Sequence, residues 1–192
     1  MTSKTAITAA PILDVLAQRW SPRSYDATHE IADKDLLSIL EAGRWAPSAN
    51  NMQPWRFSVA KRGSELHGKV VANLSGFNAA WSPKASAYLV VSILNVTPDG
   101  NPYPIAMFDA GLAVGNILTQ IQALGLHGHV MAGMNHAEMH KALGLADELS
   151  VVVVLTIGKV ASADLLEGGA HDREVAPRER HALDEIVLHG KP

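Results

Sequence analysis

One long segment, Ile105–Leu124, restricts the fold of this chain more than any other. Its apolar residues lie nearly all round a helix of this length, which is typical of a helix buried on most sides. Small residues that would let a second backbone come close are interspersed along it, at Ala106, Ala110, Gly111, Ala113 and Gly115. The segment predicts a central helix covered either by its own chain or by a second copy across a symmetric interface, and the dimer is the preferred interpretation.

The composition indicates an ordinary globular chain. Its 192 residues suffice for one domain, and a hydrophobic fraction of 47% supplies ample core. The balance of 16 Lys and Arg against 19 Asp and Glu gives a net charge of −3, so no nucleic-acid partner is expected. The absence of cysteine excludes disulfides, thiolate nucleophiles and Cys-ligated metals.

The N-terminal residues 1–10 are small and polar and lack the apolar stretch of a secretory signal. We expect a flexible leader before a single domain, with the whole chain, 1–192, as one unit. No apolar run approaches the ~20 residues of a membrane helix. A cytoplasmic protein without a membrane partner is therefore expected.

Predicted helices and strands interleave irregularly, which indicates an α+β fold. Helices are predicted over Pro11–Arg19, Asp33–Trp45, Ser64–Leu74, Ile105–Leu124, His136–Leu143 and Leu183–Leu188. Strands are predicted over Trp55–Ala60, Tyr88–Leu94, His127–Met131 and Ser150–Ile157. The last strand lacks polar alternation, so both of its faces should be buried. The polar, glycine-containing segment Asp164–Ala176 is predicted to be a loop.

Two basic motifs could bind an anion. Arg19, Ser21 and Arg23 alternate at a helix-to-loop junction, and Arg178 and Arg180 repeat this spacing near the C-terminus. Alternate residues of an extended segment share one side, and guanidinium groups bind phosphate bidentately. The C-terminal pair could complete an anion site begun by the first motif. Solvated surface arginines are the alternative interpretation of each motif.

The segment Ala46–Pro54 places hydroxyl and amide side chains between two prolines. Neutral donors and acceptors suit the edge of a heteroaromatic ring better than a metal or a phosphate; an ordinary turn before a strand is the alternative. Further along, Gly133 closes a short apolar strand, where a backbone could approach something flat.

Together these motifs resemble the nitroreductase family. Arg19–Tyr25 resembles its Arg-x-Ser-x-Arg-x-aromatic opening, and Pro47–Trp55 its Pro-Ser-Ser-x-Asn-x-Gln-Pro-Trp loop. Asp109–Leu126 resembles its long central helix, and Pro177–Arg180 its basic C-terminal element. The motifs occur in the family's order, from the start of the first predicted helix to the end of the last.

The resemblance implies a nitroreductase-like α+β fold with a central, mostly antiparallel sheet flanked by helices. It implies a homodimer with the long helix at the interface and FMN sites there. The implied activity takes a hydride from NADH or NADPH onto flavin N5 and reduces a small acceptor, such as a nitroaromatic or a quinone, by a two-step ping-pong cycle. No side chain is implied as an obligate acid or base, and no metal is implied.

The resemblance also assigns cofactor-binding residues. Arg19, Ser21 and Arg23 would bind the FMN phosphate and ribityl chain, and Arg178 and Arg180 would approach the phosphate from the C-terminal side. The other subunit would line the flavin with Pro47, Ser48, Asn51 and Gln53. The isoalloxazine would lie beside Met131, Ala132 and Gly133.

Two positions depart from the family pattern. Ala49 replaces the second serine of the loop motif, and Ala132 stands where relatives often carry an acidic residue. These changes keep open the alternative of an FMN-binding sensor or carrier without efficient turnover. Asn78 could supply an amide near the flavin pyrimidine, but it is not included in the predicted set.

Four histidines, His127, His129, His136 and His140, support a third interpretation, a His-ligated metalloenzyme. His136 and His140 are spaced to share one helix face. The zinc-protease pattern requires Glu directly after the first His, whereas Glu138 comes one position late. Scattered surface and edge histidines are the preferred interpretation.

Overall fold

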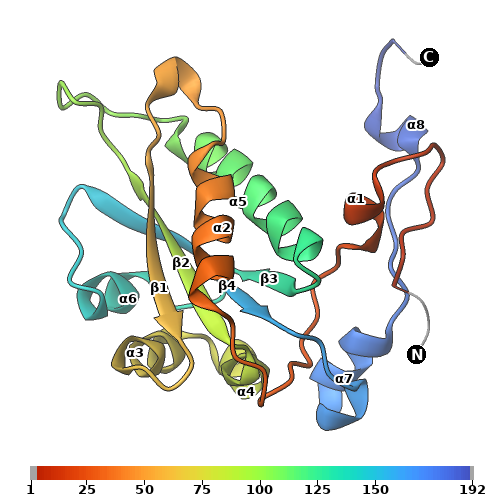
Figure 1. Ribbon diagram of the computed structural model, residues 1–192. Coiled ribbons are helices and arrows are strands. Elements are labelled where there is room, and N and C mark those ends of the chain that lie inside the picture. The colour runs from red at the N-terminus through yellow and green to blue at the C-terminus, as the bar shows by residue number, and fades with distance from the viewer. Residues whose placement is uncertain (1–3, 191–192) are drawn as a thin grey trace.

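The central layer of the molecule is a four-stranded sheet in the order β1-β2-β4-β3 (Figure 1). The computed structural model describes residues 4–190. The strands are β1 (Trp55–Lys61), β2 (Ala87–Leu94), β3 (His127–Met131) and β4 (Leu149–Gly158). Every pairing between them is antiparallel. The predicted α+β fold with an antiparallel sheet is therefore confirmed.

Helices cover both faces of this sheet (Figure 1). The α-helices are α1 (Asp14–Gln18), α2 (Asp33–Arg44), α3 (Glu65–Asn73), α4 (Gly76–Trp81), α5 (Ala106–Ala123), α6 (His136–Ala142), α7 (Gly168–Val175) and α8 (Leu183–Ile186). Short 3-10 turns are formed by η1 (Ala49–Asn51), η2 (Ser82–Lys84) and η3 (Ala163–Leu165). No helix within residues 4–190 is both long and apolar enough to cross a membrane.

The two inner strands, β2 and β4, divide the core into two parts. Leu89 pairs with Leu155, and both pack with the side chains of α2 and α5. Val90 pairs with Val154, and both pack on the opposite side with α3 and α6. Successive strand residues point to opposite faces, so a continuous apolar run supplies both halves of the core. This is the physical reason why β4 lacks polar alternation.

The long helix α5 lies across one face of the sheet. Its inner stripe is buried and consists of Ala106, Ala110, Ala113, Ile117 and Ile121. Its outer stripe is exposed to solvent in the single chain and consists of Ile105, Met107, Phe108, Gly111 and Gly115. A helix that is apolar all round thus has only one side covered by its own chain.

The two ends of the chain form a terminal arm, defined as residues 4–18 and 176–190, which extends away from the sheet (Figure 1). The Ala6 N–H donates to the Ala17 carbonyl at 2.9 Å, and Arg178 donates to the Lys4 carbonyl at 2.6 Å. Of the predicted flexible leader, residues 1–3 lie outside the described residues and residues 4–10 lie in this arm. The flexibility of the leader stays a prediction.

Two segments differ from the sequence-based expectation. The predicted loop over Asp164–Ala176 is wrong, because this segment contains η3 and the helix α7. The inward face of α7 presents Ala170 and the buried Glu174, a pair without the apolar signal of an amphipathic helix. The short helix α4 is absent from the predicted elements, since its six residues are too few to show a period.

Gly43 provides a test of the packing between α2 and α5. A Cβ at this position would lie 2.7 Å from Ile117 Cδ1 and 3.2 Å from Phe57 Cζ. Because Ile117 is fully buried, Gly43→Ala should lower the free energy of unfolding by about 1–3 kcal/mol. Urea denaturation measures this change.

Gly68→Ala is the matched control for that experiment. Gly68 lies in α3, and a Cβ at this position would have no atom within 4 Å, so alanine should raise stability by roughly 0.5–1 kcal/mol. Equal effects of the two substitutions would contradict the assigned packing.

Candidate functional site

The segment Arg19–Arg23 begins where α1 ends and passes beside β3. The ring of Trp20 makes an edge contact with His127, with 6.0 Å between ring centroids. Nδ1 of His129 lies 2.9 Å from the Pro22 carbonyl oxygen. Contacts from two alternate residues of one strand therefore fix the path of this predicted binding segment.

A buried carboxylate fixes the other end of the same segment. The side chain of Glu174, which is 3% exposed, accepts hydrogen bonds from the backbone N–H groups of Arg23 at 2.7 Å and Ser24 at 3.1 Å. Burial raises the pKa of Glu174, although these two donors and the nearby Arg23 act in the opposite direction. The helix α7, which the sequence pattern does not reveal, thus supports the first basic motif.

Three of the predicted arginines form a basic cluster, defined as Arg19, Arg178 and Arg180. Burial lowers the pKa of Arg19, and Arg180 lowers it further. The pKa of Arg178 is lowered by burial and then by Arg19 and Arg180. No carboxylate within residues 4–190 forms an ion pair with any of the three. A cluster of like charges without a counter-ion is suited to a bound anion.

One guanidinium of the cluster is held in place by backbone groups. Arg178 donates to the carbonyl of Ala17 at 2.8 Å as well as to that of Lys4. The two basic motifs, far apart in the sequence, are joined through the terminal arm, as the spacing of their arginines suggests.

Arg23 lies apart from the basic cluster. Its guanidinium carbon is 5.9 Å from the centroid of the Trp81 ring, and its Nε is buried without a hydrogen-bond partner among the described residues. Burial lowers its pKa most, and its charged neighbours are Glu174 and Arg173. Ser21, half-buried, precedes it in the same segment. The structure thus separates the two arginines of the first motif.

The end of β3 forms a second part of the predicted site. Met131 is buried, whereas Ala132 and Gly133 are exposed. The Gly133 carbonyl accepts hydrogen bonds from the Ser75 N–H at 2.9 Å and from Asn78 Nδ2 at 3.1 Å. A Cβ on Gly133 would lie 2.8 Å from that Asn78 nitrogen. Asn78, which is not in the predicted set, therefore lies directly beside Gly133, and the unpredicted helix α4 carries it there.

The segment Ala46–Pro54 forms a loop around η1. Asn50, Asn51 and Gln53 have positive φ angles of 51°, 55° and 47°, a region that costs roughly 1 kcal/mol or more per non-glycine residue. Gln53 N–H donates to Ser48 Oγ at 3.0 Å, and its side-chain amide donates to the Asn51 carbonyl at 3.0 Å. Pro47 and Asn51 are exposed.

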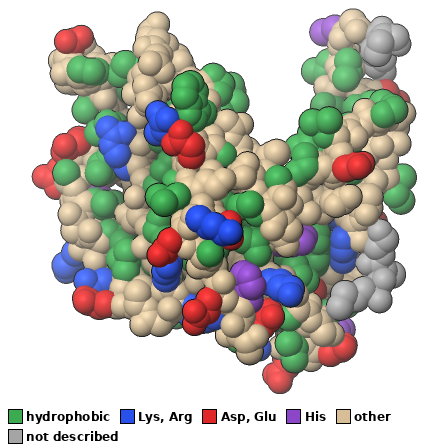
Figure 2. Space-filling view, in the orientation of Figure 1, with side chains coloured by type: hydrophobic (Ala, Val, Ile, Leu, Met, Phe, Trp, Pro, Cys, Tyr) green, Lys and Arg blue, Asp and Glu red, His purple; other side chains and the backbone are tan. Residues whose placement is uncertain are grey.

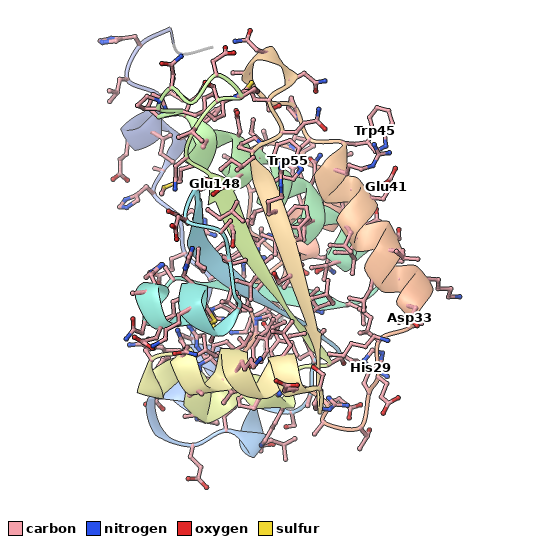
Figure 3. The ribbon with its side chains drawn as sticks, turned by 90° about the vertical axis from the view of Figure 1, so that its left-hand side faces the viewer. His29, Asp33, Glu41, Trp45, Trp55 and Glu148 are labelled. Atoms are coloured by element: carbon pink, nitrogen blue, oxygen red, sulfur yellow. The ribbon has the colours of Figure 1, made fainter. Side chains whose placement is uncertain are left out.

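The residues on either side of this loop anchor it to the body. Trp55, at the start of β1, is buried and packs with Ala46 and with Ala113 of α5. Trp45, at the end of α2, is exposed, and its Nε1 donates to Glu41 at 2.8 Å (Figure 3). Both ends of the loop are therefore attached to helices of the body.

The loop Ala46–Pro54 and the basic cluster lie at opposite ends of α5 (Figure 1). Asp109, in the first turn of α5, contacts the loop through the Ala49 N–H. Arg19 and Trp20 lie beside His127, just after the other end of the helix. A helix of 18 residues is about 27 Å long. One chain does not bring the loop and the basic cluster together.

The four histidines contact separate backbone groups. His136 Nδ1 lies 2.9 Å from the Val151 carbonyl, and His140 Nε2 lies 3.0 Å from that of Ala146. Across residues 4–190 there is no group of three or more His, Asp or Glu side chains that could hold a metal ion. The metalloenzyme alternative therefore gains no support from the arrangement of these residues.

Comparisons with known proteins identify the family of this chain. The model of the "Nitroreductase family" matches residues 16–87 and 65–159. A "Putative NAD(P)H nitroreductase" of Haemophilus influenzae is 26% identical over 95% of this chain and 98% of its own length. A "Putative NADH dehydrogenase/NAD(P)H nitroreductase" of Archaeoglobus fulgidus is 33% identical over 76% of this chain and 83% of its own length.

Two solved structures are similar to this chain in fold. One, described as "the oxidoreductase containing FMN", has a TM-score of 0.91 and 32% identity, covering 100% of this chain and 98% of that chain. A putative nitroreductase of Desulfovibrio desulfuricans in complex with FMN has a TM-score of 0.74 and 26% identity, covering 96% and 99%.

His129 gives a pH-dependent test of the contacts beside the first motif. Burial lowers its pKa from 6.5 to about 4. Between these values the unfolded state binds a proton that the folded state does not, so stability should fall as the pH is lowered through this window.

His129→Asn retains a donor for the Pro22 carbonyl and removes the titrating group. The urea midpoint of this variant should fall less than that of the wild type between pH 7 and pH 5. An equal fall in both proteins would contradict the assigned role of His129.

Proposed function

This chain belongs to the nitroreductase family, and we propose that it is an FMN-dependent oxidoreductase that uses NADH or NADPH. The basic cluster carries this proposal. Arg178 donates to the Ala17 carbonyl, two residues before Arg19, and the charges of Arg19, Arg178 and Arg180 act on one another. None of the three forms an ion pair with a carboxylate among residues 4–190. Their shared positive charge fits the phosphate group of FMN, which solved relatives of this chain are described as containing.

The other predicted residues would hold the remainder of the cofactor. Arg23 would bind a part of FMN other than the phosphate, because its guanidinium lies near Trp81 and not in the basic cluster. Gly133 and Asn78, joined by a hydrogen bond, would border the flavin ring at the end of β3. When bound, FMN would supply the redox chemistry, by which a hydride from NADH or NADPH serves to reduce a small acceptor, such as a nitroaromatic or a quinone, in a ping-pong cycle.

A homodimer would complete each site. The loop that carries Ser48 and Asn51 lies at the other end of α5 from the basic cluster, so a second copy is needed to supply it. The outer stripe of α5 is available for such contact, since Phe108 is 69% exposed. Apart from its chain neighbours and the backbone of its own helix, a Cβ on Gly111 or Gly115 would have no atom of the described residues within 4 Å.

The shape of the single chain also supports a dimer. Figure 2 shows a hollow between the body and the terminal arm, with hydrophobic side chains on both sides. The arm exposes the apolar side chains of Ile7, Leu13, Leu183, Ile186 and Leu188. Apolar surface of this extent is typical of a protein–protein interface, and a symmetric partner would cover it.

Visible absorption tests the proposed activity. The protein purified with excess FMN should show bound-flavin bands that bleach when NADH or NADPH is added without oxygen and return when a quinone is added. Bands that persist after both nucleotides would favour the sensor or carrier. Absence of bound flavin would contradict the proposal.

Arg19→Ala should weaken FMN binding by about 10- to 100-fold, since a hydrogen bond to a charged group contributes about 1.5–3 kcal/mol. The affinity for riboflavin, which lacks the phosphate, should fall far less in this variant than the affinity for FMN. Lys69→Ala is the control, because Lys69 is an exposed cation that pairs with Glu65 on α3. An Arg19→Ala protein with full FMN affinity would contradict the phosphate role.

Gly111→Arg tests the dimer. The side chain should fit the single chain, because the space around a Cβ at Gly111 is open, but it would project from the outer stripe of α5. We expect light scattering to show monomers that bind little FMN and retain the far-UV circular dichroism of the wild type. A dimer with full flavin content would contradict the assignment of this helix face.

A further inference from the structure

Ala49, at the centre of the loop, is held through its backbone by two residues from outside the loop. Asp109 Oδ1 accepts a hydrogen bond from the Ala49 N–H at 3.4 Å. Tyr103 Oη donates to Asp109 Oδ2 at 2.5 Å and lies 3.3 Å from the Ala49 carbonyl oxygen. Both backbone polar groups of Ala49 thus contact the Tyr103–Asp109 pair.

The hydroxyl of Tyr103 is the donor of this pair and the carboxylate of Asp109 is the acceptor. Asp109 is 2% exposed and lies in the first turn of α5, where the helix dipole favours a negative charge. Loss of hydration and the bond to Asp109 raise the pKa of Tyr103 to about 12, so the phenol remains a donor at neutral pH. The Tyr103 backbone N–H donates to the Asn95 carbonyl at 2.8 Å, which fixes the residue after β2.

The loop needs such external contacts. Asn50, Asn51 and Gln53 have left-handed backbone conformations, which persist only where the surroundings enforce them. The bonds of Gln53 to Ser48 and Asn51 are internal to the loop and move with it. Arg56 of β1 donates to the Gln53 carbonyl at 3.1 Å, near the end of the loop. The Tyr103–Asp109 pair connects the centre of the loop to the long helix.

We propose that Tyr103 and Asp109 are positioning residues that hold residues 48–53 in the shape that reaches the flavin of a second copy. This inference rests on the proposed function and deepens it. It also accounts for Ala49, where the family motif has serine: the contacts are made to backbone atoms, so the loop is held without a hydroxyl at this position.

Tyr103→Phe tests the proposal by removing a single oxygen atom. Hydrogen exchange of the peptide covering residues 46–54 should become faster in the cofactor-free protein. The dissociation constant for FMN should rise by roughly 10-fold, as expected for one hydrogen bond to a charged group. The visible circular dichroism of bound FMN should change as well, because the loop borders the ring in the proposed dimer.

Tyr88→Phe is the matched control. Its hydroxyl lies 2.7 Å from Ser82 Oγ and is buried in the other half of the core. This variant removes a buried hydroxyl without touching the loop, so exchange of residues 46–54 and FMN affinity should equal those of the wild type. Asp109→Asn is a second test variant, since it keeps the shape of the side chain and replaces one acceptor by a donor.

Each result separates the positioning role from a merely structural one. Unchanged exchange of the loop in Tyr103→Phe would overturn the inference. Faster exchange with unchanged FMN affinity and circular dichroism would also overturn it, because the pair would then be structural only. Wild-type protein that binds no FMN would instead overturn the proposed function, and the inference with it.

Discussion

The packing of α5 on the β2–β4 pair is the contact from which the positions of the other elements follow. Its inner stripe meets Leu89 and Leu155, and α2 packs against its side where Gly43 leaves room for Ile117. The first turn of α5 supports the loop through Asp109, and His127, just beyond its other end, contacts the first basic motif. Because a helix is stiff, it keeps these two functional parts a fixed distance apart.

The buried carboxylate near the first basic motif binds backbone amides and not the arginines of the basic cluster. The motif is therefore held in place while the positive charge of the cluster is not neutralised. Glu174 binds the backbone of residues 23 and 24, and the basic cluster remains without an ion pair among residues 4–190. Mutual repulsion among its arginines disfavours the cofactor-free state. A bound dianionic phosphate would relieve that repulsion, so the free energy of binding also stabilises the fold. Cofactor binding at this cluster would therefore also stabilise the arm that brings Arg178 to Arg19.

Most elements with strong local patterns could be predicted. All four strands and the long helix follow from apolar runs and periods that depend on neighbouring residues. The helix α7 could not be predicted, because its buried face includes Glu174, whose partners are backbone amides about 150 residues away. Asn78 was missed for a related reason: only the packing of α4 beside β3 brings its amide to Gly133. The sequence grouped Arg19 and Arg23 with the two C-terminal arginines, whereas the structure places Arg23 apart from the other three, near Trp81.

Local chemistry was enough to predict the α+β class, the long helix that is apolar nearly all round, the basic motifs and the amide-rich loop. These properties depend on side-chain type and on short-range backbone geometry, which neighbouring residues in the sequence determine. Tertiary structure alone decided that Arg23 lies apart from the other three arginines, that a buried glutamate orders one of the basic motifs, and that the loop lies a helix length away. Such contacts join residues far apart in the chain, and their energy depends on distances in space that no local pattern records.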